Sequence, residues 1–458
     1  MECPASSILS TVHSVTQDGR RLSVDCLLIM FSHSIIFALV AGATQCISWP
    51  PGPFRTEGKN IVDATGLPFT YVGINWPGEG EIMIPEGLQY SSIADIVAKI
   101  KSLDYNSVRM GWATEMVDDI LDNGGDVSIK DSMVKALGPE LAPSIICQIL
   151  DHNPNFTENT TRLEVWDAVA AELHKQKLHL VFNNHVSKAI WCCSPDDGNG
   201  WFGDTYFNVA KWKRSLAYMA KYTAKWPART AFSLRNELRH VNGPADDTYG
   251  WSLWYDEMID AANIVNAAAP DTLVFLSGLN YDHELNPITA GEPLRPPEDS
   301  RVFTLSDFHY ADKIVFELHS YDNSIANCTF FQSELYQRGF NALDVTSQTT
   351  ARNIAPVVLT EFGFAQNSSD YQGVYASCLK DFLTGDNRVL NASRIEGPIG
   401  HFEWNLGGSY YIREGIVDHD DWWALLNHDW SDWRNHTVLD AYQIPLLRKT
   451  LNGDAQAP

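Results

Sequence analysis

Two strings, SLRNEL at residues 233–238 and VLTEFG at residues 358–363, decide how we interpret the fold of this chain. Each is part of an apolar run typical of a strand, and each carries a glutamate near its end, Glu237 and Glu361. Burying a carboxylate at the tip of a strand costs free energy unless the group is paired or used. Two such glutamates, far apart in sequence, therefore predict two carboxyl groups that face each other across a pocket.

Runs rich in Val, Ile, Leu and Phe recur along the chain and alternate with helix-length segments. Alternation of strand and helix predicts a parallel sheet, and eight strands predict a closed α/β fold, the (β/α)8 or TIM barrel. We expect strands at Thr70–Asn75, Ser107–Met110, Leu178–Asn184, Thr230–Glu237, Leu273–Ser277, Ile314–Tyr321, Val357–Glu361 and Gly400–Trp404. We expect helices at Ile93–Leu103, Leu163–Gln176, Val209–Lys225, Tyr255–Ala268 and Tyr371–Phe382.

Two stretches, Trp112–Thr161 and Tyr281–Lys313, are longer than a simple barrel needs. We expect them to be insertions that build the walls of a cleft. The sequence shows no internal repeat and no low-complexity linker. Residues 44–458 are therefore predicted to form a single domain.

The first 43 residues have the pattern of a secretory signal. Arg20 and Arg21 precede an apolar run, Cys26–Val40, that leads to small residues ending at Ala43. This pattern predicts cleavage after Ala43, with Met30 as an alternative start of the chain. The competing interpretation is a membrane anchor, but polar residues 32–34 leave the run short for a span. Both interpretations place the rest of the protein outside the cytosol, and we expect it to be secreted and free of the membrane.

Cysteines and glycosylation sequons agree with export. An even number of cysteines after residue 43 fits disulfides in an oxidising compartment. Their pairing stays open, with Cys328–Cys378 as one candidate. The cysteines are Cys46, Cys147, Cys192, Cys193, Cys328 and Cys378, and the sequons begin at Asn155, Asn159, Asn327, Asn367, Asn391 and Asn435.

The charge of the chain limits its partners. With 33 Lys and Arg against 57 Asp and Glu, the formal net charge is -24. Nucleic acids and anionic membrane surfaces require a basic patch, so neither is an expected partner. The charge suits a soluble protein that works in mildly acidic surroundings, or one with a neutral substrate, and we expect a monomer.

Polar side chains gather at one end of nearly every predicted strand. In a (β/α)8 barrel these ends meet at one face, so their side chains converge on one pocket. Besides the two glutamates, the strand ends carry Arg109, His185, Asn236, His319, Tyr321 and Trp404.

This set of residues resembles glycoside hydrolase family 5, the cellulase and mannanase family, from about Gly73 to about Arg434. The strings WCCSPDDGNGW at residues 191–201 and GSYYIREG at residues 408–415 resemble loops of its secreted fungal and plant members. The resemblance implies that Glu237 is the general acid/base and Glu361 the nucleophile. The family commonly has proline after the acid/base, whereas Leu238 stands here, so we expect an altered loop geometry. The resemblance implies supporting roles for Arg109, His185, Asn236, His319, Tyr321 and Trp404.

The chemistry can also be argued from the residues alone. A retaining glycosidase needs two carboxyl groups roughly 5–5.5 Å apart, one ionised and one protonated. Arg109 and the hydroxyl of Tyr321 are expected to stabilise the charged form of Glu361 and keep its pKa low. Asn236 is suited to hold a sugar hydroxyl.

Several of these residues have simpler interpretations. His185 is as well explained by a structural histidine, and Trp404 by core packing. Asp418, Asp420 and Asp421 lie near Glu414 with His419 among them and could bind a cation such as calcium, but a solvated acidic loop is far more common. We therefore predict no metal and no cofactor.

The sequence thus predicts an endo-acting, retaining β-glycosidase that hydrolyses a β-1,4-linked plant polysaccharide, with glucan first and mannan second. An exo-acting or aglycone-directed β-glycosidase on the same fold is the first alternative. A non-catalytic carbohydrate-binding barrel is the alternative from another class. Specificity resides in loops that these motifs do not describe.

Overall fold

The computed structural model describes residues 49–452, of which residues 50–452 form one compact unit. The predicted signal region, residues 1–43, lies outside the described residues.

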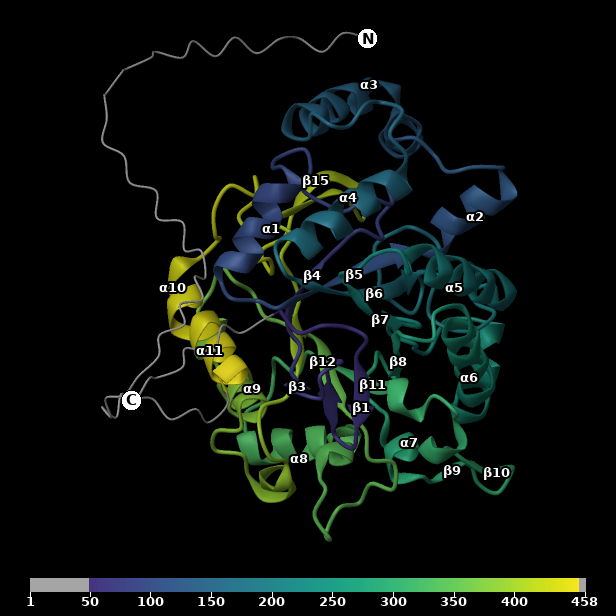
Figure 1. Cartoon of the computed structure of the whole chain (residues 1–458), viewed down its shortest axis with the longest axis vertical. Helices are drawn as coiled ribbons and strands as arrows, with labels where there is room; N and C mark the ends of the chain where they lie inside the picture. Colours follow the sequence, from purple (N-terminus) through teal and green to yellow (C-terminus); the bar gives the residue numbers. More distant parts are fainter. Residues whose placement is uncertain (1–48, 453–458) are drawn as a thin grey trace, which may run out of the picture. The chain divides into compact units, whose positions relative to one another are not determined.

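A closed barrel of parallel strands forms the centre of this unit (Figure 1). Neighbouring strands follow one another in chain order, and the last pairs with the first. The predicted (β/α)8 barrel is confirmed, and every predicted strand overlaps a strand of the barrel. However, the strand predicted over Thr230–Glu237 ends at Ser233, so Glu237 lies in the loop that follows it. The strands are β4 Val72–Trp76, β5 Ser107–Ala113, β6 His179–Val186, β7 Arg229–Ser233, β8 Leu273–Ser277, β11 Ile314–Ser320, β12 Val357–Phe362 and β13 His401–Glu403.

Helices surround the strands and bury their apolar faces against the outside of the barrel (Figure 1). The helix α4, for example, begins with a capping box, in which Thr161 and Glu164 each bond the backbone of the other. The predicted helices are confirmed to within a few residues at their ends. The helices are α1 Ile93–Ser102, α4 Arg162–Lys175, α5 Val209–Thr223, α6 Trp251–Ala268, α8 Cys328–Arg338, α9 Val374–Thr384 and α11 Ile444–Asn452.

A small antiparallel sheet closes one end of the barrel. It consists of β1 Arg55–Glu57, β2 Asn60–Val62 and β3 Pro68–Phe69. Its apolar side chains join a buried cluster with inward residues of the barrel such as Phe275 and Phe402. Because this end is filled with apolar side chains, only the opposite end is left to hold a polar site.

The segment between β5 and α4 folds into α2 Thr114–Asp122 and α3 Ile129–His152. By length and composition α3 would suffice to cross a membrane. However, Gly138, with φ of 78°, breaks it into two shorter helices, and neither half has the roughly 20 residues that a span requires.

The remaining elements lie in the loops. A hairpin of β14 Ser409–Arg413 and β15 Ile416–Asp420, which the sequence did not predict, follows β13. A disulfide between Cys328 and Cys378 joins α8 to α9, the pairing that the sequence offered as one candidate. The other elements are α7 Asn286–Ala290, β9 Pro293–Arg295, β10 Asp299–Val302, α10 His436–Val438 and short turns.

Candidate active site

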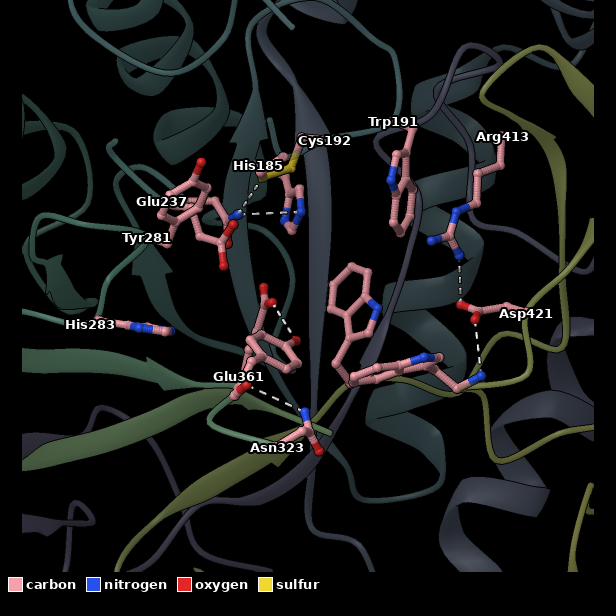
Figure 2. A pocket seen from close by; sticks show the side chains of 15 residues that line it. His185, Trp191, Cys192, Glu237, Tyr281, His283, Asn323, Glu361, Arg413 and Asp421 are labelled. Carbon is pink, nitrogen blue, oxygen red and sulfur yellow. Dashed lines mark hydrogen bonds and ion pairs between the residues drawn. A yellow bond between two sulfur atoms is a disulfide. The ribbon is translucent and has the colours of Figure 1, made fainter. Parts of the chain in front are cut away.

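A cavity of about 390 Å³ opens at the carboxyl ends of the barrel strands, opposite the small sheet. In Figure 2, Glu237 and Glu361 lie on one side of it, and Trp191, Arg413 and Asp421 lie on the other. The strand-end residues predicted from the sequence thus meet in one place. The cavity is lined by His185, Trp191, Cys192, Cys193, Asn236, Glu237, Tyr281, His283, Tyr321, Asn323, Glu361, Trp404, Arg413, Asp421 and Trp423.

Glu237 and Glu361 face each other across this cavity. One oxygen of each carboxyl group lies within 4.8 Å of the other, and a ring nitrogen of His319 lies within the same distance of both. Retaining glycosidases place their two carboxyl groups about 5–5.5 Å apart, whereas inverting enzymes leave about 6.5–9.5 Å for a water molecule. The separation found here belongs to the first geometry.

Glu361 is held by two donors. Its Oε1 accepts a hydrogen bond from Arg109 Nη1 at 2.7 Å, and its Oε2 accepts one from the Tyr321 hydroxyl at 2.9 Å. Arg109 is itself buried and also donates to the side-chain oxygens of Asn75 and Asn236, each at 2.8 Å. Both carboxylate oxygens of Glu361 are therefore fixed by donors that favour its ionised form.

Glu237 is held differently, because no arginine or lysine among residues 49–452 donates to its carboxyl group. Its Oε1 lies 3.0 Å from His319 Nδ1, and its backbone carbonyl accepts a hydrogen bond from Arg239. The residue has φ of 48°, in the left-handed region. A following proline disfavours helical conformations in the residue before it, so leucine at position 238 suits this backbone.

Burial dominates the titration of the pair. It raises the pKa of Glu237 above its ordinary value, and Arg239 acts in the opposite direction. Burial also raises the pKa of Glu361, although His319 and Arg109 oppose it. Our prediction of a low pKa for Glu361 is therefore wrong, because the loss of water outweighs the two favourable partners. Two carboxyl groups this close retain one proton between them, and the donors on Glu361 direct that proton to Glu237.

His319 and His185 are neutral components of the site. Burial lowers the pKa of His319 to about 3 and that of His185 well below its ordinary value. The ring of His185 stacks on Trp404 at 5.4 Å, and its Nε2 lies 3.6 Å from a carboxylate oxygen of Glu79. Both sequence interpretations of His185 are thus partly met, since it is a packed side chain that also lines the cavity.

Glu79 is a residue that the sequence analysis missed. It is buried behind His185, and burial raises its pKa to about 7. It lies three residues beyond the end of β4, so a search of every strand end for acidic residues would have found it.

The wall opposite the glutamates consists of side chains from loops, among them Trp191, Arg413 and Asp421. The guanidinium of Arg413 lies 3.6 Å from the centre of the Trp191 ring and 3.2 Å from a carboxylate oxygen of Asp421. Arg413 comes from the β14–β15 hairpin. Such contacts between loops leave no periodic pattern in the sequence.

The predicted origin of the cleft walls is only partly right. Tyr281 and His283, from the insertion after β8, do line the cavity. Within residues 49–452, none of its lining residues comes from Trp112–Thr161, so that prediction is wrong. Trp112 instead stacks on Phe182 beneath the surface.

Two clusters have the geometry to hold a metal ion, but their chemistry does not suit one. Glu237, His319 and Glu361 converge, yet Arg109 already places a positive charge on Glu361. His185, Cys192 and Cys193 converge, but the two sulfurs form a disulfide and are not thiolates.

Two of the acidic residues of the β15 region are paired with other side chains of the chain. Asp420 pairs with Arg434 at 2.7 Å, and Asp421 accepts a hydrogen bond from Asn405 at 2.9 Å. Their oxygens bind donors of the chain itself.

A (β/α)8 barrel that places two buried carboxyl groups at this separation has the architecture of a glycoside hydrolase. The family model for the cellulases, glycosyl hydrolase family 5, matches residues 62–384. The chain belongs to this family, as the resemblance in its sequence predicted.

Relatives and solved structures agree with this assignment. A glycosyl hydrolase 5 family protein of Chamaecyparis obtusa is 31% identical over 412 residues, covering 88% of this chain and 66% of that protein. An endoglucanase of Paenibacillus polymyxa is 20% identical over 89% of this chain and 91% of its own length. The chain thus spans slightly less than two thirds of the first relative.

Two solved structures share the fold at low sequence identity. An endocellulase from Pyrococcus horikoshii in complex with cellotetraose superposes with a TM-score of 0.59 at 16% identity, covering 87% of this chain and 98% of the other. The catalytic domain of the major endoglucanase from Xanthomonas campestris superposes with a TM-score of 0.57 at 17% identity, covering 86% of this chain and 99% of the other.

Proposed function

We propose that this protein is a retaining, endo-acting β-glycosidase that cleaves β-1,4-linked glucan, with mannan as the second candidate substrate. The observation that carries the mechanism is the separation of Glu237 and Glu361, within 4.8 Å, together with their different partners. The names of the relatives, an endoglucanase and endocellulases, support glucan. The basic, apolar and small residues before position 44 support secretion.

In the first step, a carboxylate oxygen of Glu361 attacks the anomeric carbon of the sugar. The bond from that carbon to the leaving oxygen breaks, and Glu237 transfers its proton to that oxygen. The products are the shortened glycan with a free hydroxyl and a glycosyl ester on Glu361.

In the second step, Glu361 is a neutral ester, so its charge no longer raises the proton affinity of Glu237. Glu237 then takes a proton from a water molecule, which attacks the anomeric carbon as the ester bond breaks. Two inversions at one carbon leave the configuration unchanged, and both glutamates return to their starting states.

The side chains around the pair are arranged to hold a sugar ring. Trp404 lines the cavity and is backed by His185, which gives a flat apolar surface for stacking. Arg109 donates to the side-chain oxygen of Asn236. The amide nitrogen of Asn236 lies 3.4 Å from His185 Nε2 and 3.7 Å from Cys193 Sγ at the cavity wall, where it can also donate to a sugar hydroxyl.

Azide rescue tests the mechanism. Replacing Glu237 by Ala removes the acid/base, and azide should restore turnover on an activated aryl glycoside and give a β-azide product. The change Glu361→Gln should abolish turnover on all substrates. The matched control is Glu292→Gln, at an exposed glutamate, which should keep wild-type activity. An α-azide product, or turnover of Glu361→Gln within a few-fold of wild type, would contradict the proposal.

A product profile tests the mode of cleavage and the substrate. Soluble glucan, mannan, xylan and xyloglucan are incubated with the enzyme, and the early products are separated by length. Mixed oligosaccharides from glucan are expected. A single small product from the start would show exo action, and tight binding without any turnover would show a binding protein.

A further inference from the structure

The loop that follows β8 is bonded to the segment that carries Glu237. The Ser277 hydroxyl donates to the carbonyl of Arg235 at 2.6 Å, and the Tyr281 backbone N–H donates to the carbonyl of Leu238 at 3.1 Å. These two bonds lie on either side of Glu237 in the sequence. The loop after β8 therefore sets the path of the backbone through the acid/base.

A third bond falls on Glu237 itself. Its backbone N–H donates to Asp282 Oδ2 at 2.8 Å. Asp282 has no exposed surface, although its neighbours Tyr281 and His283 both line the cavity. The aspartate thus points away from the cavity and into the body of the protein, toward the backbone of the acid/base.

The backbone at Asp282 is strained in order to achieve this. Asn280, Tyr281 and Asp282 have φ of 54°, 59° and 58°, so three consecutive non-glycine residues adopt the left-handed conformation. Residues other than glycine adopt this conformation only at a cost in free energy. A turn of this kind persists only where its surroundings hold it, and such strain concentrates at functional sites.

Asp282 also contacts the histidine that supports the acid/base. Its Oδ2 lies 3.7 Å from the ring nitrogen Nε2 of His319. Its backbone carbonyl accepts a hydrogen bond from the backbone N–H of His319 at 2.9 Å. On the other side of the ring, His319 Nδ1 lies 3.0 Å from Glu237 Oε1. One residue therefore touches both the main chain of Glu237 and the ring on which its carboxyl group rests.

We propose that Asp282 is a positioning residue, which holds Glu237 in the orientation needed to transfer its proton to the glycosidic oxygen. This inference rests on the proposed function, because it assigns Glu237 the role of acid. The role of Asp282 is that of a hydrogen-bond acceptor of the right length at a fixed place. It touches neither the sugar nor the reacting atoms.

The surroundings of Asp282 favour an acceptor role over a role for its charge. Burial raises the pKa of its carboxyl group well above the ordinary value, and the charges of Glu317 and Glu237 act in the same direction, while the hydrogen bond from the Glu237 backbone N–H and the charge of Arg109 oppose them. A protonated carboxyl group still accepts an N–H through its carbonyl oxygen. An asparagine can do the same.

The test compares Asp282→Ala with Asp282→Asn on two substrates. Soluble β-1,4-glucan has a poor leaving group that needs the acid, whereas 2,4-dinitrophenyl β-cellobioside has a good one that does not. For Asp282→Ala, we expect kcat/KM to fall about 30-fold or more on glucan and to stay within about 3-fold of wild type on the aryl glycoside. For Asp282→Asn, both values should stay within about 3-fold.

If Asp282 had a merely structural role, Asp282→Ala would lower kcat/KM equally on both substrates, and that result would overturn the inference. So would an unchanged rate on glucan, or an Asp282→Asn variant as impaired as Asp282→Ala. If the alanine variant does not fold, Asp282→Ser takes its place, since serine fills part of the space but cannot reach the Glu237 N–H. It should show the same dependence on the leaving group.

Two controls separate this inference from the proposed function. Glu237→Ala, run beside the Asp282 variants, must lose glucan turnover and keep the first step on the aryl glycoside. If it does not, the proposed function fails. If Glu237→Ala behaves in this way but Asp282→Ala does not lose glucan turnover, only the inference fails. Asp344→Ala removes another fully buried aspartate, which Tyr336 and Thr346 bind, and should leave both rates unchanged per folded molecule.

Discussion

At the scale of single residues, Arg109 organises the site. It is buried at the centre of the barrel end and bonds three side chains from three different strands or strand ends, Asn75, Asn236 and Glu361. Only the planar guanidinium offers several donors in a fixed arrangement. The position of the nucleophile and that of the sugar-facing amide therefore depend on one side chain.

Replacing Arg109 by Lys should consequently reduce kcat/KM on glucan about 100-fold. Lysine keeps the charge beside Glu361 but cannot bond all the partners at once. Steady-state kinetics on folded protein, checked by circular dichroism, measures the effect. An Arg109→Lys enzyme with activity within a few-fold of wild type would show that charge alone suffices.

Many of the site residues could be predicted because strand ends in a barrel meet at one face. Glu237, Glu361, Arg109 and His319 were found in this way. Asp282 could not be found, since it lies in an irregular turn and its partner is a backbone N–H. The direction of the Glu361 pKa could not be predicted either, because it depends on how much water the folded protein excludes.

At the scale of elements, two disulfides that join described residues make different contributions. Cys328–Cys378 closes a loop with a sequence separation of 50 and ties α8 to α9, whereas Cys192–Cys193 joins adjacent residues at the cavity wall. Closing a longer loop removes more conformational entropy from the unfolded chain. Only the first is therefore expected to affect folding stability strongly.

The double variant Cys328→Ser, Cys378→Ser should lower the free energy of unfolding by up to about 4 kcal/mol. Denaturant unfolding under non-reducing conditions measures this. The matched control is the pair Cys192→Ser, Cys193→Ser, which closes no loop. We expect the control to change stability far less and to act on substrate affinity instead. Equal losses of stability for the two pairs would contradict this account.

Strands and helices were predicted well because alternating apolar runs record which face of each element is buried. The β14–β15 hairpin was missed. The first residues of β14 are buried, whereas the first residues of β15, Ile416 and Val417, are exposed although they are apolar. The local pattern of the sequence therefore did not distinguish it from a loop.

At the scale of the whole molecule, buried acids make stability depend on pH. Glu403 on β13 lies between the barrel and the C-terminal helices, where Gln443 and Gln366 donate to it. Burial raises its pKa from 4.5 to about 8. The folded protein therefore retains a proton that the unfolded chain releases above about pH 4.5, and stability falls as the pH rises toward 8.

The change Glu403→Gln should remove this part of the pH dependence. Between pH 5 and 8, the decline in the free energy of unfolding should be shallower than in wild type, by at most about 1.4 kcal/mol per pH unit. At pH 5 the two proteins should be nearly equally stable. Denaturant titrations at several pH values measure the slope. The exposed Glu292→Gln control should keep the wild-type slope, and an unchanged slope in Glu403→Gln would contradict the prediction.

The sequence by itself determined the barrel and the meeting of its two glutamates. The order of strands and helices dictates a closed parallel sheet, and such a sheet brings every strand end to one face. Only the tertiary structure decided how the pair is held: by Arg109 and Tyr321 on one side and by His319 and Asp282 on the other. These contacts join residues far apart in the chain, and their strength depends on distance and on the exclusion of water, which no local pattern of residues records.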